Sequence, residues 1–285
     1  MILITGAAGK TGRTVFSALL KCGQEVRVMV HRQEQADEFL AIGACSALVG
    51  DMTKIESYRE AMNGIEAVYH ICPNMHPREV EIGLIAINAA LTSGLKQFVY
   101  HSVLHPQVEK MPHHWNKLSV EEALFESGLN FTILQPAPYM QNILSGRNLI
   151  LQESRYLIPY PVSSKISMVD LEDLGRAAAL VLSEPDHKAA IYEIVGTVAL
   201  SQAEMAEIIS AVLDKNVAAE EIPLEQWIQN AKNAGLGSYQ VETLVKMFEY
   251  YARFGLYGNN FVLKKLLKGE PQNFAGFVRR ELLSN

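Results

Sequence analysis

Three glycines in the segment 6–12 (GAAGKTG) have the spacing of a turn that holds a dinucleotide phosphate. In such a turn the first glycine permits a sharp bend, the second lets the backbone approach a pyrophosphate, and the third allows close packing of helix on strand. The helix that follows offers unpaired N–H groups and the positive end of its dipole. The residues expected to bind a cofactor here are Gly6, Ala8, Gly9, Lys10, Thr11 and Gly12. An ATP-type P-loop is excluded, because it needs a glycine at the position of Ile4.

The residues after the second predicted strand indicate which dinucleotide binds. An NAD site commonly carries an acidic residue there for the ribose 2′-hydroxyl, whereas an arginine pairs with the 2′-phosphate of NADP. Arg32 stands at this point and no carboxylate appears before Glu34, so the sequence favours NADP(H) over NAD(H). Lys10 or Arg13 would add positive charge. The alternative is that Arg32 is a solvated arginine at a strand end.

The elements that must position these residues alternate between short β-rich runs and longer amphipathic ones. Strands are predicted at 2–5, 25–30, 47–49, 67–71, 97–102, 130–135 and 191–195. Helices are predicted at 14–22, 35–42, 55–62, 79–93, 116–127 and about 170–183, the last with Asp170 as its N-cap. The fold class is therefore α/β, a Rossmann-like doubly wound parallel sheet. Asp51 and Met52 follow the third strand and are expected to border the adenine, with Asp51 accepting from its amino group.

The alternation of strand-like and helix-like segments ends after Pro136, where a proline-rich stretch up to Pro161 indicates a loop-rich segment. A capping box at 201–204 opens a mostly helical remainder, with a last helix near 273–283. We expect a small, mostly helical C-terminal lobe against the sheet edge and no separate domain. The single NAD(P)-binding unit over 1–285 would have its core at about 1–136 and 166–198, and the lobe at about 137–165 and 199–285.

Composition and charge restrict the class of protein. The chain has 285 residues, 49% of them hydrophobic, and 25 basic against 31 acidic side chains give a formal net charge of −6. No basic stripe and no bilayer-length apolar run is present, so neither nucleic acid nor membrane is an expected partner. Three widely spaced cysteines and an opening without a signal-like pattern favour the cytoplasm. The eight histidines lack metal-ligand spacing, and no metal site is predicted.

Six segments spread over nearly the whole chain resemble one known family. They are 4–12 (ITGAAGKTG), 28–32 (VMVHR), 49–51 (VGD), 131–136 (FTILQP), 168–175 (MVDLEDLG) and 266–271 (LLKGEP). Together they are similar to the NmrA-like branch of the atypical short-chain dehydrogenase/reductase superfamily. The resemblance implies NADP(H) binding and one of two functions. Some members reduce quinones or related electrophiles, and others are redox-sensing regulators with little or no catalysis.

The resemblance also implies that the nicotinamide lies at the carboxyl ends of three strands, where open α/β sheets bind ligands. The residues implied there are Ile71, Cys72, Pro73, Ser102, Pro136 and Tyr139. We expect Cys72 to pack beside the cofactor and not to act as a nucleophile, because no base or anion hole is assignable to it.

The typical short-chain dehydrogenase motif is altered in this chain. That motif is Tyr-x-x-x-Lys, in which the tyrosine donates a proton and the lysine holds the ribose. None of the 11 tyrosines is followed by lysine at the fourth position, and the equivalent slot holds His113 and Lys117. We predict Lys117 and His113 as catalytic residues, with Lys117 also binding the cofactor. Either His113 donates a proton near neutral pH or Lys117 fills both roles; the alternative for His113 is a loop histidine without chemistry.

The expected function is hydride transfer from NADPH to a small quinone-like or conjugated electrophile by an NAD(P)H-dependent oxidoreductase. The rival is an NADP(H)-sensing regulatory protein with little or no catalysis, which the missing tyrosine favours. The expected partner is the small-molecule electrophile, lodged between the strand ends and the lobe. The aromatic side chains of Tyr250, Tyr251, Phe254 and Tyr257 would form lobe core or line that pocket. A homodimer or a protein partner is left open.

Overall fold

The computed structural model describes residues 1–283 and forms two compact units. Unit 1 contains Met1–Gln107, His113–Gln135 and Leu174–Tyr192. Unit 2 contains Val108–Pro112, Pro136–Asp173 and the residues from Glu193 onward.

Unit 1 is built on a seven-stranded parallel sheet with the order β3-β2-β1-β4-β5-β6-β9. The strands are β1 (Ile2–Thr5), β2 (Val26–Val30), β3 (Ser46–Val49), β4 (Ala67–His70), β5 (Gln97–His101), β6 (Phe131–Pro136) and β9 (Ala190–Ile194). Every residue of the central strands β1 and β4 is buried, as expected for parallel strands covered on both faces. The predicted α/β, Rossmann-like fold class is confirmed.

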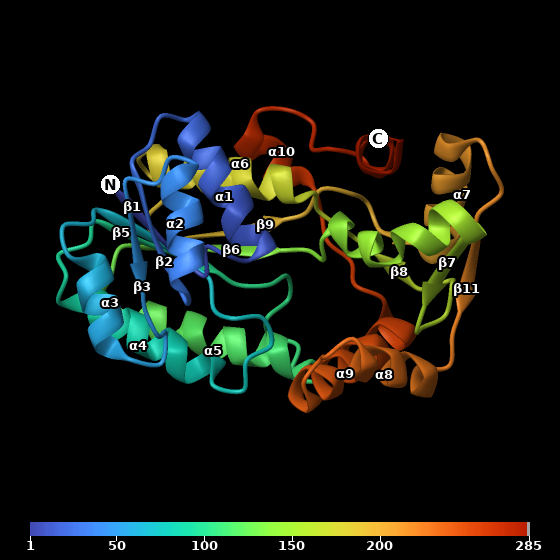
Figure 1. Cartoon of the computed structure of the whole chain (residues 1–285), viewed down its shortest axis with the longest axis horizontal. Coiled ribbons are helices and arrows are strands. Elements are labelled where there is room, and N and C mark those ends of the chain that lie inside the picture. The colour runs from blue at the N-terminus through green and yellow to red at the C-terminus, as the bar shows by residue number, and fades with distance from the viewer. Residues whose placement is uncertain (284–285) are drawn as a thin grey trace. The chain divides into compact units, whose positions relative to one another are not determined.

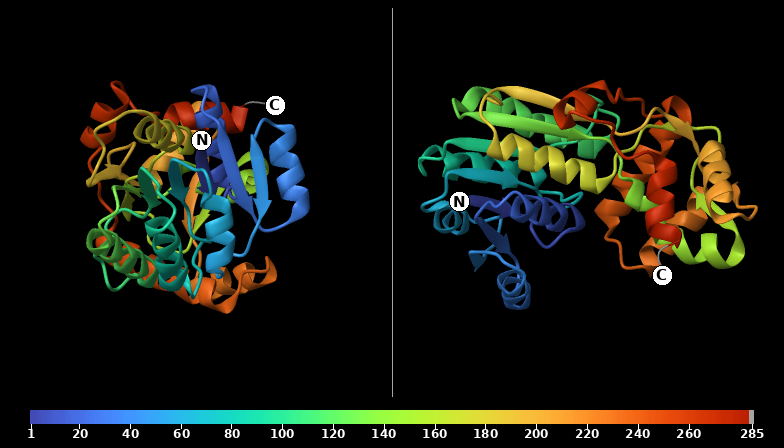
Figure 2. Two further views of the ribbon diagram at one scale, coloured as in Figure 1. Left: turned by 90° about the vertical axis from the view of Figure 1, so that its left-hand side faces the viewer. Right: turned by 90° about the horizontal axis from the view of Figure 1, so that it is seen from above.

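Six helices cover the two faces of this sheet (Figure 1). They are α1 (Lys10–Lys21), α2 (Gln33–Ala41), α3 (Ile55–Met62), α4 (Glu79–Leu91), α5 (Pro112–Ser127) and α6 (Leu171–Ser183). Helices α1, α2 and α6 lie on one face and α3, α4 and α5 on the other. The right-hand view of Figure 2 shows α6, in yellow, beside α1, in blue, where Gly175 faces Thr14. On the other face, a Cβ added to Gly83 of α4 would stand 2.5 Å from Cγ2 of Val120 in α5, so these two helices pack closely.

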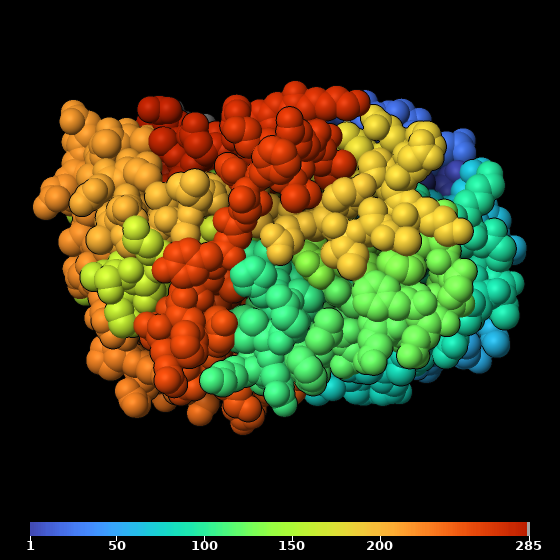
Figure 3. All heavy atoms as spheres, turned by 180° about the vertical axis from the view of Figure 1, so that it is seen from behind, coloured from blue at the N-terminus to red at the C-terminus, as the bar shows by residue number. Residues whose placement is uncertain are grey.

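One cluster of buried hydrophobic residues lies around the α3, α4 and α5 layer and includes the fully buried rings of Tyr58, Phe98 and Tyr100. Figure 3 views the molecule from the side of the β9 edge of the sheet, where α5, in green, and the segment with β9, in gold, reach the surface. The buried polar residues His113, Lys117 and Glu121 lie on α5, which contributes Val120 and Leu124 to this core.

The predicted boundaries differ most at α5. This helix was expected over 116–127 and begins at Pro112, because proline fits the first turn of a helix, where its missing N–H costs no hydrogen bond. The prediction of a loop at His113 is therefore wrong. His113 and Lys117 lie four residues apart on one helix, and both are buried. Helix α1 likewise begins at Lys10, directly after Gly9, instead of at position 14.

Unit 2 is mostly helical, as predicted, with short strands that were not predicted. Its elements are η1 (Met140–Gly146), η2 (Leu149–Glu153), β7 (Arg155–Ile158), β8 (Lys165–Ile166), β10 (Leu200–Ser201), α7 (Gln202–Leu213), β11 (Ala218–Glu221), α8 (Leu224–Asn233), α9 (Ser238–Phe254), α10 (Phe261–Leu267), α11 (Phe274–Val278) and η3 (Arg279–Leu283). Strands β7 and β11 pair in parallel, and β8 and β10 pair antiparallel. The predicted capping box is confirmed: Ser201 Oγ accepts from the N–H of Glu204, and Oε2 of Glu204 accepts from the N–H of Ser201.

Two predictions about side chains in unit 2 have different outcomes. Asp170 is fully buried and accepts from the N–H of Glu172 at 3.2 Å, as an N-cap should, and it also holds Arg280 through two hydrogen bonds of 2.7 and 3.1 Å. Phe254 and Tyr257 have 43% and 53% of their surface exposed. The expectation that they form lobe core is therefore wrong, whereas Tyr251 is buried.

Candidate functional site

The segments predicted to bind a dinucleotide directly follow neighbouring parallel strands. Gly6 follows β1, Arg32 lies two residues beyond β2, Asp51 two beyond β3, Ile71 follows β4 and Ser102 follows β5. Because the carboxyl ends of parallel strands meet at one edge of a sheet, the structure gathers these residues along that edge of unit 1. Pro136 is the last residue of β6, and Tyr139 belongs to unit 2, where it forms a bridge with Val169.

The glycine turn has the geometry that its sequence predicts. Gly6 has φ +64°, and a Cβ there would stand 2.7 Å from the carbonyl oxygen of Ile71. A Cβ on Gly12 would stand 2.5 Å from the carbonyl oxygen of Gly6, so the close helix–strand approach needs glycine. A Cβ on Gly9 would meet only that same oxygen, at 3.5 Å. Gly9 is thus the position where the fold itself has room, as expected if a ligand requires the bare backbone.

The start of α1 suits a phosphate. Its N-cap is Gly9, which supplies no side chain to the free N–H groups, and the first turn carries no acidic residue. The side chains of Lys10 and Thr11 stand in this turn, and Ala8 precedes it. An anion at this helix end would receive the N–H donors that a capping side chain would otherwise take.

The two arginines near the turn differ in how their charge is used. Arg13 donates to Glu38 through two hydrogen bonds of 2.7 Å and donates a third, of 3.2 Å, to the carbonyl of Ala8. The prediction that Arg13 adds positive charge for the cofactor is weakened, because Glu38 already balances it. Arg32 is exposed, its backbone N–H is held by Oε1 of Gln35, and no carboxylate in the described part of the chain pairs with its guanidinium.

Asp51 and Met52 shape the loop after β3. Oδ1 of Asp51 accepts from the N–H of Thr53 at 2.8 Å and from its hydroxyl at 2.7 Å, and these hydrogen bonds lower the pKa of Asp51. Oδ2 accepts from none of the described residues, so that oxygen is the one suited to an adenine amino group. Met52 is half-buried and packs against the core of unit 1.

A buried carboxylate joins the two predicted catalytic residues. Glu79, the first residue of α4, has 1% of its surface exposed. Its Oε1 lies 2.7 Å from Nζ of Lys117, and its Oε2 lies 3.0 Å from Nδ1 of His113. Burial raises the pKa of Glu79, but the Lys117 ammonium and the His113 imidazole outweigh burial and lower that pKa to about 2. At neutral pH Glu79 is therefore a carboxylate that forms an ion pair with Lys117 and a hydrogen bond with His113.

Lys117 is fixed by more than this ion pair. Nζ donates to the carbonyl oxygen of His101, the last residue of β5, at 3.1 Å, and it lies 5.4 Å from the centre of the Tyr100 ring. An ammonium has three N–H donors, so one is left for a ligand hydroxyl such as that of a ribose. The lysine is thus anchored to the end of β5, where a dinucleotide in the predicted position would pass.

Neutral histidines stand behind this cluster. His101 is hydrogen-bonded through Nδ1 to the hydroxyl of Tyr69 at 2.7 Å, and His70 through Nδ1 to the hydroxyl of Thr5 at 2.8 Å. Burial, with the Lys117 ammonium nearby, lowers the pKa of each histidine to about 3. Both rings are therefore uncharged at neutral pH, and His113 is the histidine here that faces a carboxylate.

A second buried acid engages the predicted residue Ser102. Ser102 Oγ is hydrogen-bonded to Oε1 of Glu121, and the side-chain amide of Gln135 donates to both carboxyl oxygens at 3.0 Å. Burial raises the pKa of Glu121, although the hydrogen bonds from Ser102 and Gln135 oppose that effect. This second cluster holds the ends of β5 and β6 to α5.

Cys72 and Pro73 follow β4 as predicted. Cys72 has 5% of its surface exposed, and its Sγ contacts the carbonyl oxygen of Glu79 at 3.9 Å. Burial and the neighbouring Glu79 carboxylate raise the pKa of its thiol well above the usual range, which agrees with a packing role. Among residues 1–283, no group of three or more His, Cys, Asp or Glu side chains is placed to hold a metal ion, and no helix is long and apolar enough to cross a membrane.

Glu79 and Glu121 were missed by the sequence reasoning. An acidic residue in the first turn of a helix is ordinary, and Glu81 two positions later looks the same but lies on the surface. A signal was available in α5, where His113, Lys117 and Glu121 are spaced by four and so share one face with Val120 and Leu124. A buried helical face that carries three titratable groups requires buried partners.

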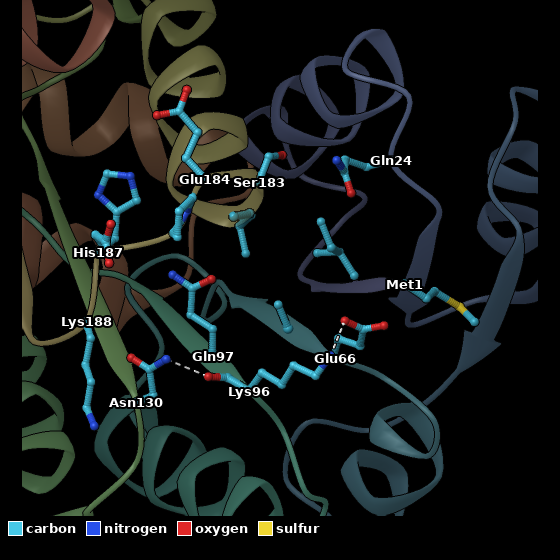
Figure 4. Close-up of a pocket in the computed structure, with 15 residues that line it drawn as sticks. Met1, Gln24, Glu66, Lys96, Gln97, Asn130, Ser183, Glu184, His187 and Lys188 are labelled. Atoms are coloured by element: carbon cyan, nitrogen blue, oxygen red, sulfur yellow. Dashed lines mark hydrogen bonds and ion pairs between the residues drawn. The ribbon is translucent and has the colours of Figure 1, made fainter.

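A separate hollow lies at the opposite edge of unit 1, where the strands begin (Figure 4). Its volume is about 510 Å³, and it is lined by Met1, Ile2, Gln24, Glu66, Ala67, Lys96, Gln97, Asn130 and the segment 182–188. Lys96 pairs with Glu66 at 2.9 Å, and Asn130 donates to the carbonyl of Lys96 at 2.6 Å. None of the predicted cofactor residues lines this hollow, so the two places are distinct.

The strand order, the glycine turn and the residues at the carboxyl ends of the strands define a Rossmann-type dinucleotide-binding protein. The model of the NmrA-like family matches residues 1–278, and the chain belongs to this family. The resemblance noted in the sequence is therefore confirmed.

Relatives of the chain include named reductases. It is 31% identical over 258 residues to the NAD(P)H azoreductase of Xenophilus azovorans, covering 88% of this chain and 86% of that protein. It is 26% identical over 275 residues to quinone oxidoreductase 2 of Escherichia coli, covering 95% and 94%. Among solved structures, the NADPH-dependent quinone oxidoreductase of Escherichia coli complexed with NADPH has a TM-score of 0.86 at 24% identity, over 98% of this chain and 99% of that one.

Proposed function

We propose that this chain transfers hydride from NADPH to a small quinone-like or otherwise conjugated electrophile. The general class is given by its relatives: the chain is an NAD(P)H-dependent oxidoreductase of the NmrA-like family. What we propose beyond that class is the acceptor and the residues that serve it. When bound, NADPH supplies the hydride; the residues of the chain bind, orient and neutralise charge.

The observation that carries this proposal is the buried Glu79–Lys117–His113 cluster at the carboxyl edge of the sheet. Burying three titratable side chains together costs free energy unless they are paired, and a packing role alone would be served by apolar residues. Lys117 is proposed to hold the nicotinamide ribose with its remaining N–H and to place positive charge near oxygen developing on the acceptor. His113 is proposed to relay a proton, a role that water can share for a quinone.

The cofactor is proposed to lie along the strand ends. Gly6, Gly9 and Gly12 would admit the pyrophosphate, with donors from the α1 N-terminus. Arg32 would pair with the 2′-phosphate, because its guanidinium is exposed and no described carboxylate binds it. The proposed nicotinamide contacts are Ile71, Cys72, Pro73, Ser102, Lys117, Pro136 and Tyr139, and the adenine contacts are Asp51 and Met52.

The test is NADPH oxidation, followed at 340 nm, against a panel of quinones, enones, aldehydes and azo dyes. We expect turnover with quinones and related conjugated acceptors and little with simple aldehydes. Turnover of aldehydes alone would contradict the proposed acceptor class. NADPH binding without turnover of any acceptor would contradict the proposed catalytic function.

Two observations support a second candidate, an NADP(H)-sensing protein without catalysis. The charge of Lys117 is already balanced by Glu79, and tyrosine is absent from the slot of His113. Such a protein would bind NADPH and NADP⁺ with different affinities and leave every acceptor of the panel unreduced. Calorimetric titration of both cofactor forms, run beside the panel, distinguishes the two candidates.

A further inference from the structure

We infer that Glu79 is a positioning residue that makes His113 the proton donor of the site, and that this pair determines which acceptors the protein can reduce. The inference rests on the proposed function and goes beyond it, because it links one buried carboxylate to the proton demand of the substrate. The rate of reduction should depend on Glu79 for acceptors whose reduced form is a strong base. It should not depend on Glu79 for acceptors that need no proton.

The geometry fixes which nitrogen of His113 carries the transferable proton. Glu79 is a carboxylate and can only accept hydrogen bonds, so Nδ1 of His113, 3.0 Å from its Oε2, must carry a hydrogen. The remaining nitrogen, Nε2, has no hydrogen bond to any described residue. Any second proton of the ring is therefore held at Nε2, the atom free to deliver it.

The Glu79 carboxylate offsets the positive charge of this cluster, because it contacts both Lys117 and His113. With His113 protonated, Lys117, Glu79 and His113 together carry a net charge of +1, and the cluster becomes neutral when the proton leaves. Without the Glu79 carboxylate, an imidazolium would stand beside the buried Lys117 ammonium, and no other carboxylate among the described residues is in ion-pair contact with either of them. Of the groups around them, His101, His70 and His114 are neutral and the thiol of Cys72 is un-ionised. Glu121 also interacts with Lys117, but its carboxyl oxygens are hydrogen-bonded to Ser102 and Gln135.

Three acceptor classes differ in the proton that they require. A triphenylmethane cation takes hydride at its central carbon, a C–H bond forms, and the neutral product needs no proton. A quinone takes hydride and becomes a hydroquinone anion, a weak base that water can protonate. An azo compound takes hydride at one nitrogen, the N=N π bond breaks, and the other nitrogen becomes a strongly basic anion. Nε2–H of His113 would give its proton to that nitrogen as the second N–H bond forms, leaving the neutral ring to recover a proton from solvent.

The experiment compares kcat/KM of the wild type and Glu79→Gln on one acceptor of each class, with NADPH as reductant. We expect less than about a threefold loss on the cationic dye, a larger loss on the quinone, and a loss of about a hundredfold or more on the azo dye, the usual scale of general acid catalysis. Glu81→Gln is the matched control, since Glu81 lies on the same helix but pairs with Arg78 at the surface. It should leave all three values unchanged.

A second readout needs no turnover. In cofactor-free protein, ¹⁵N NMR of the His113 ring should show hydrogen on Nδ1 in the wild type and in Glu81→Gln. In Glu79→Gln that preference should weaken, because an amide both donates and accepts. If Glu79→Gln does not fold, Glu79→Asp takes its place: it keeps the charge but is too short to reach both partners, and the same order of losses is expected at smaller size.

Equal losses on all three acceptors, or no loss on the azo dye, would overturn the inference, because a merely structural residue affects every substrate alike. An unchanged His113 ring in Glu79→Gln would overturn it as well. If the wild type reduces quinones and Glu79→Gln changes kcat/KM equally for all acceptors, this inference is refuted and the proposed function stands. A wild type that reduces none of the three refutes the proposed function and this inference with it.

Discussion

The charged side chains along the carboxyl edge of the sheet differ in how completely the protein already balances them. Arg13 is held by Glu38, and Lys117 is held by Glu79, whereas Arg32 has no carboxylate partner among the described residues. A dinucleotide phosphate competes with whatever partner a cation already has, so an unpaired cation contributes most to binding. The charge that should decide between NADPH and NADH is therefore that of Arg32.

Arg32→Ala should weaken NADPH binding by about ten- to a hundredfold, because charge-assisted hydrogen bonds are worth about 1.5–3 kcal/mol. NADH binding should stay nearly unchanged. Calorimetric titration of both cofactors measures this, and Arg59→Ala, which removes an exposed arginine from α3, is the control. Equal weakening for both cofactors, or tight NADH binding by the wild type, would refute the role of Arg32.

Lys117→Ala should lower kcat/KM for a quinone by at least about a hundredfold, because Lys117 is proposed to act both in cofactor binding and in turnover. His113→Ala should cost much less on that acceptor, because water can take over the proton relay to a quinone. Steady-state kinetics of the two variants on one quinone measures both effects. A severe defect in His113→Ala beside a mild one in Lys117→Ala would reverse the two roles.

For single residues, the sequence indicated the motifs but not the buried side chains with which the motif residues pair. His113 and Lys117 were found because their spacing matches a known slot, and the structure brings them onto one carboxylate. Glu79 stands 34 positions before His113 in the chain, and nothing local distinguishes it from the exposed Glu81. The pairing of α4 with α5 across the sheet face decides which of the two acids is buried, and that is a tertiary property.

At the scale of elements, the glycine turn between β1 and α1 serves both the packing of helix on strand and the binding of a phosphate, and substitutions can separate the two. Gly12→Ala should destabilise the fold by about 1–3 kcal/mol, because its Cβ would stand within 2.6 Å of backbone atoms of residues 6 and 7.

Gly9→Val should leave the circular dichroism spectrum and the urea midpoint native-like and abolish NADPH binding, since only the ligand needs that volume. Wild-type NADPH affinity in Gly9→Val would mean that the turn is only a packing device.

The helices show where sequence patterns succeed and where they fail. The order of strands and helices in unit 1 was predictable, because parallel β/α units impose a simple alternation of apolar runs. The beginning of α5 was not, since the polar buried face from His113 onward lacks the apolar spacing that marks a helix. The short pairs β7–β11 and β8–β10 were missed because their strands are only two to four residues long and all except β10 carry charged side chains.

For the whole molecule, the buried histidines predict a loss of stability in mild acid. Burial lowers the pKa of His70, His101 and His114 from 6.5 to about 3. A group whose pKa is lower in the folded state stabilises the fold above its unfolded pKa and loses that contribution as pH falls through the folded value. The free energy of unfolding should therefore decrease from about pH 6.5 downward, and Glu79 adds to the decrease below about pH 4.5.

Urea unfolding at several pH values between 7 and 4 measures this slope. Each such histidine contributes up to one proton, or about 1.4 kcal/mol per pH unit. His114→Asn, which keeps a donor for the carbonyl of His105, should reduce the slope, and His31→Asn, at an exposed position, should not. A slope that is the same in the wild type and in His114→Asn would contradict the assignment.

The placement of the three cysteines has a practical consequence for following this protein in solution. Cys22 and Cys45 are exposed, whereas Cys72 is buried beside the carbonyl of Glu79. A maleimide therefore counts two thiols on the native protein and three once the end of β4 opens. The rate at which the third adduct appears in a mass spectrum measures how often the proposed nicotinamide site opens. Since the reporter is a native residue, this measurement needs no engineered label.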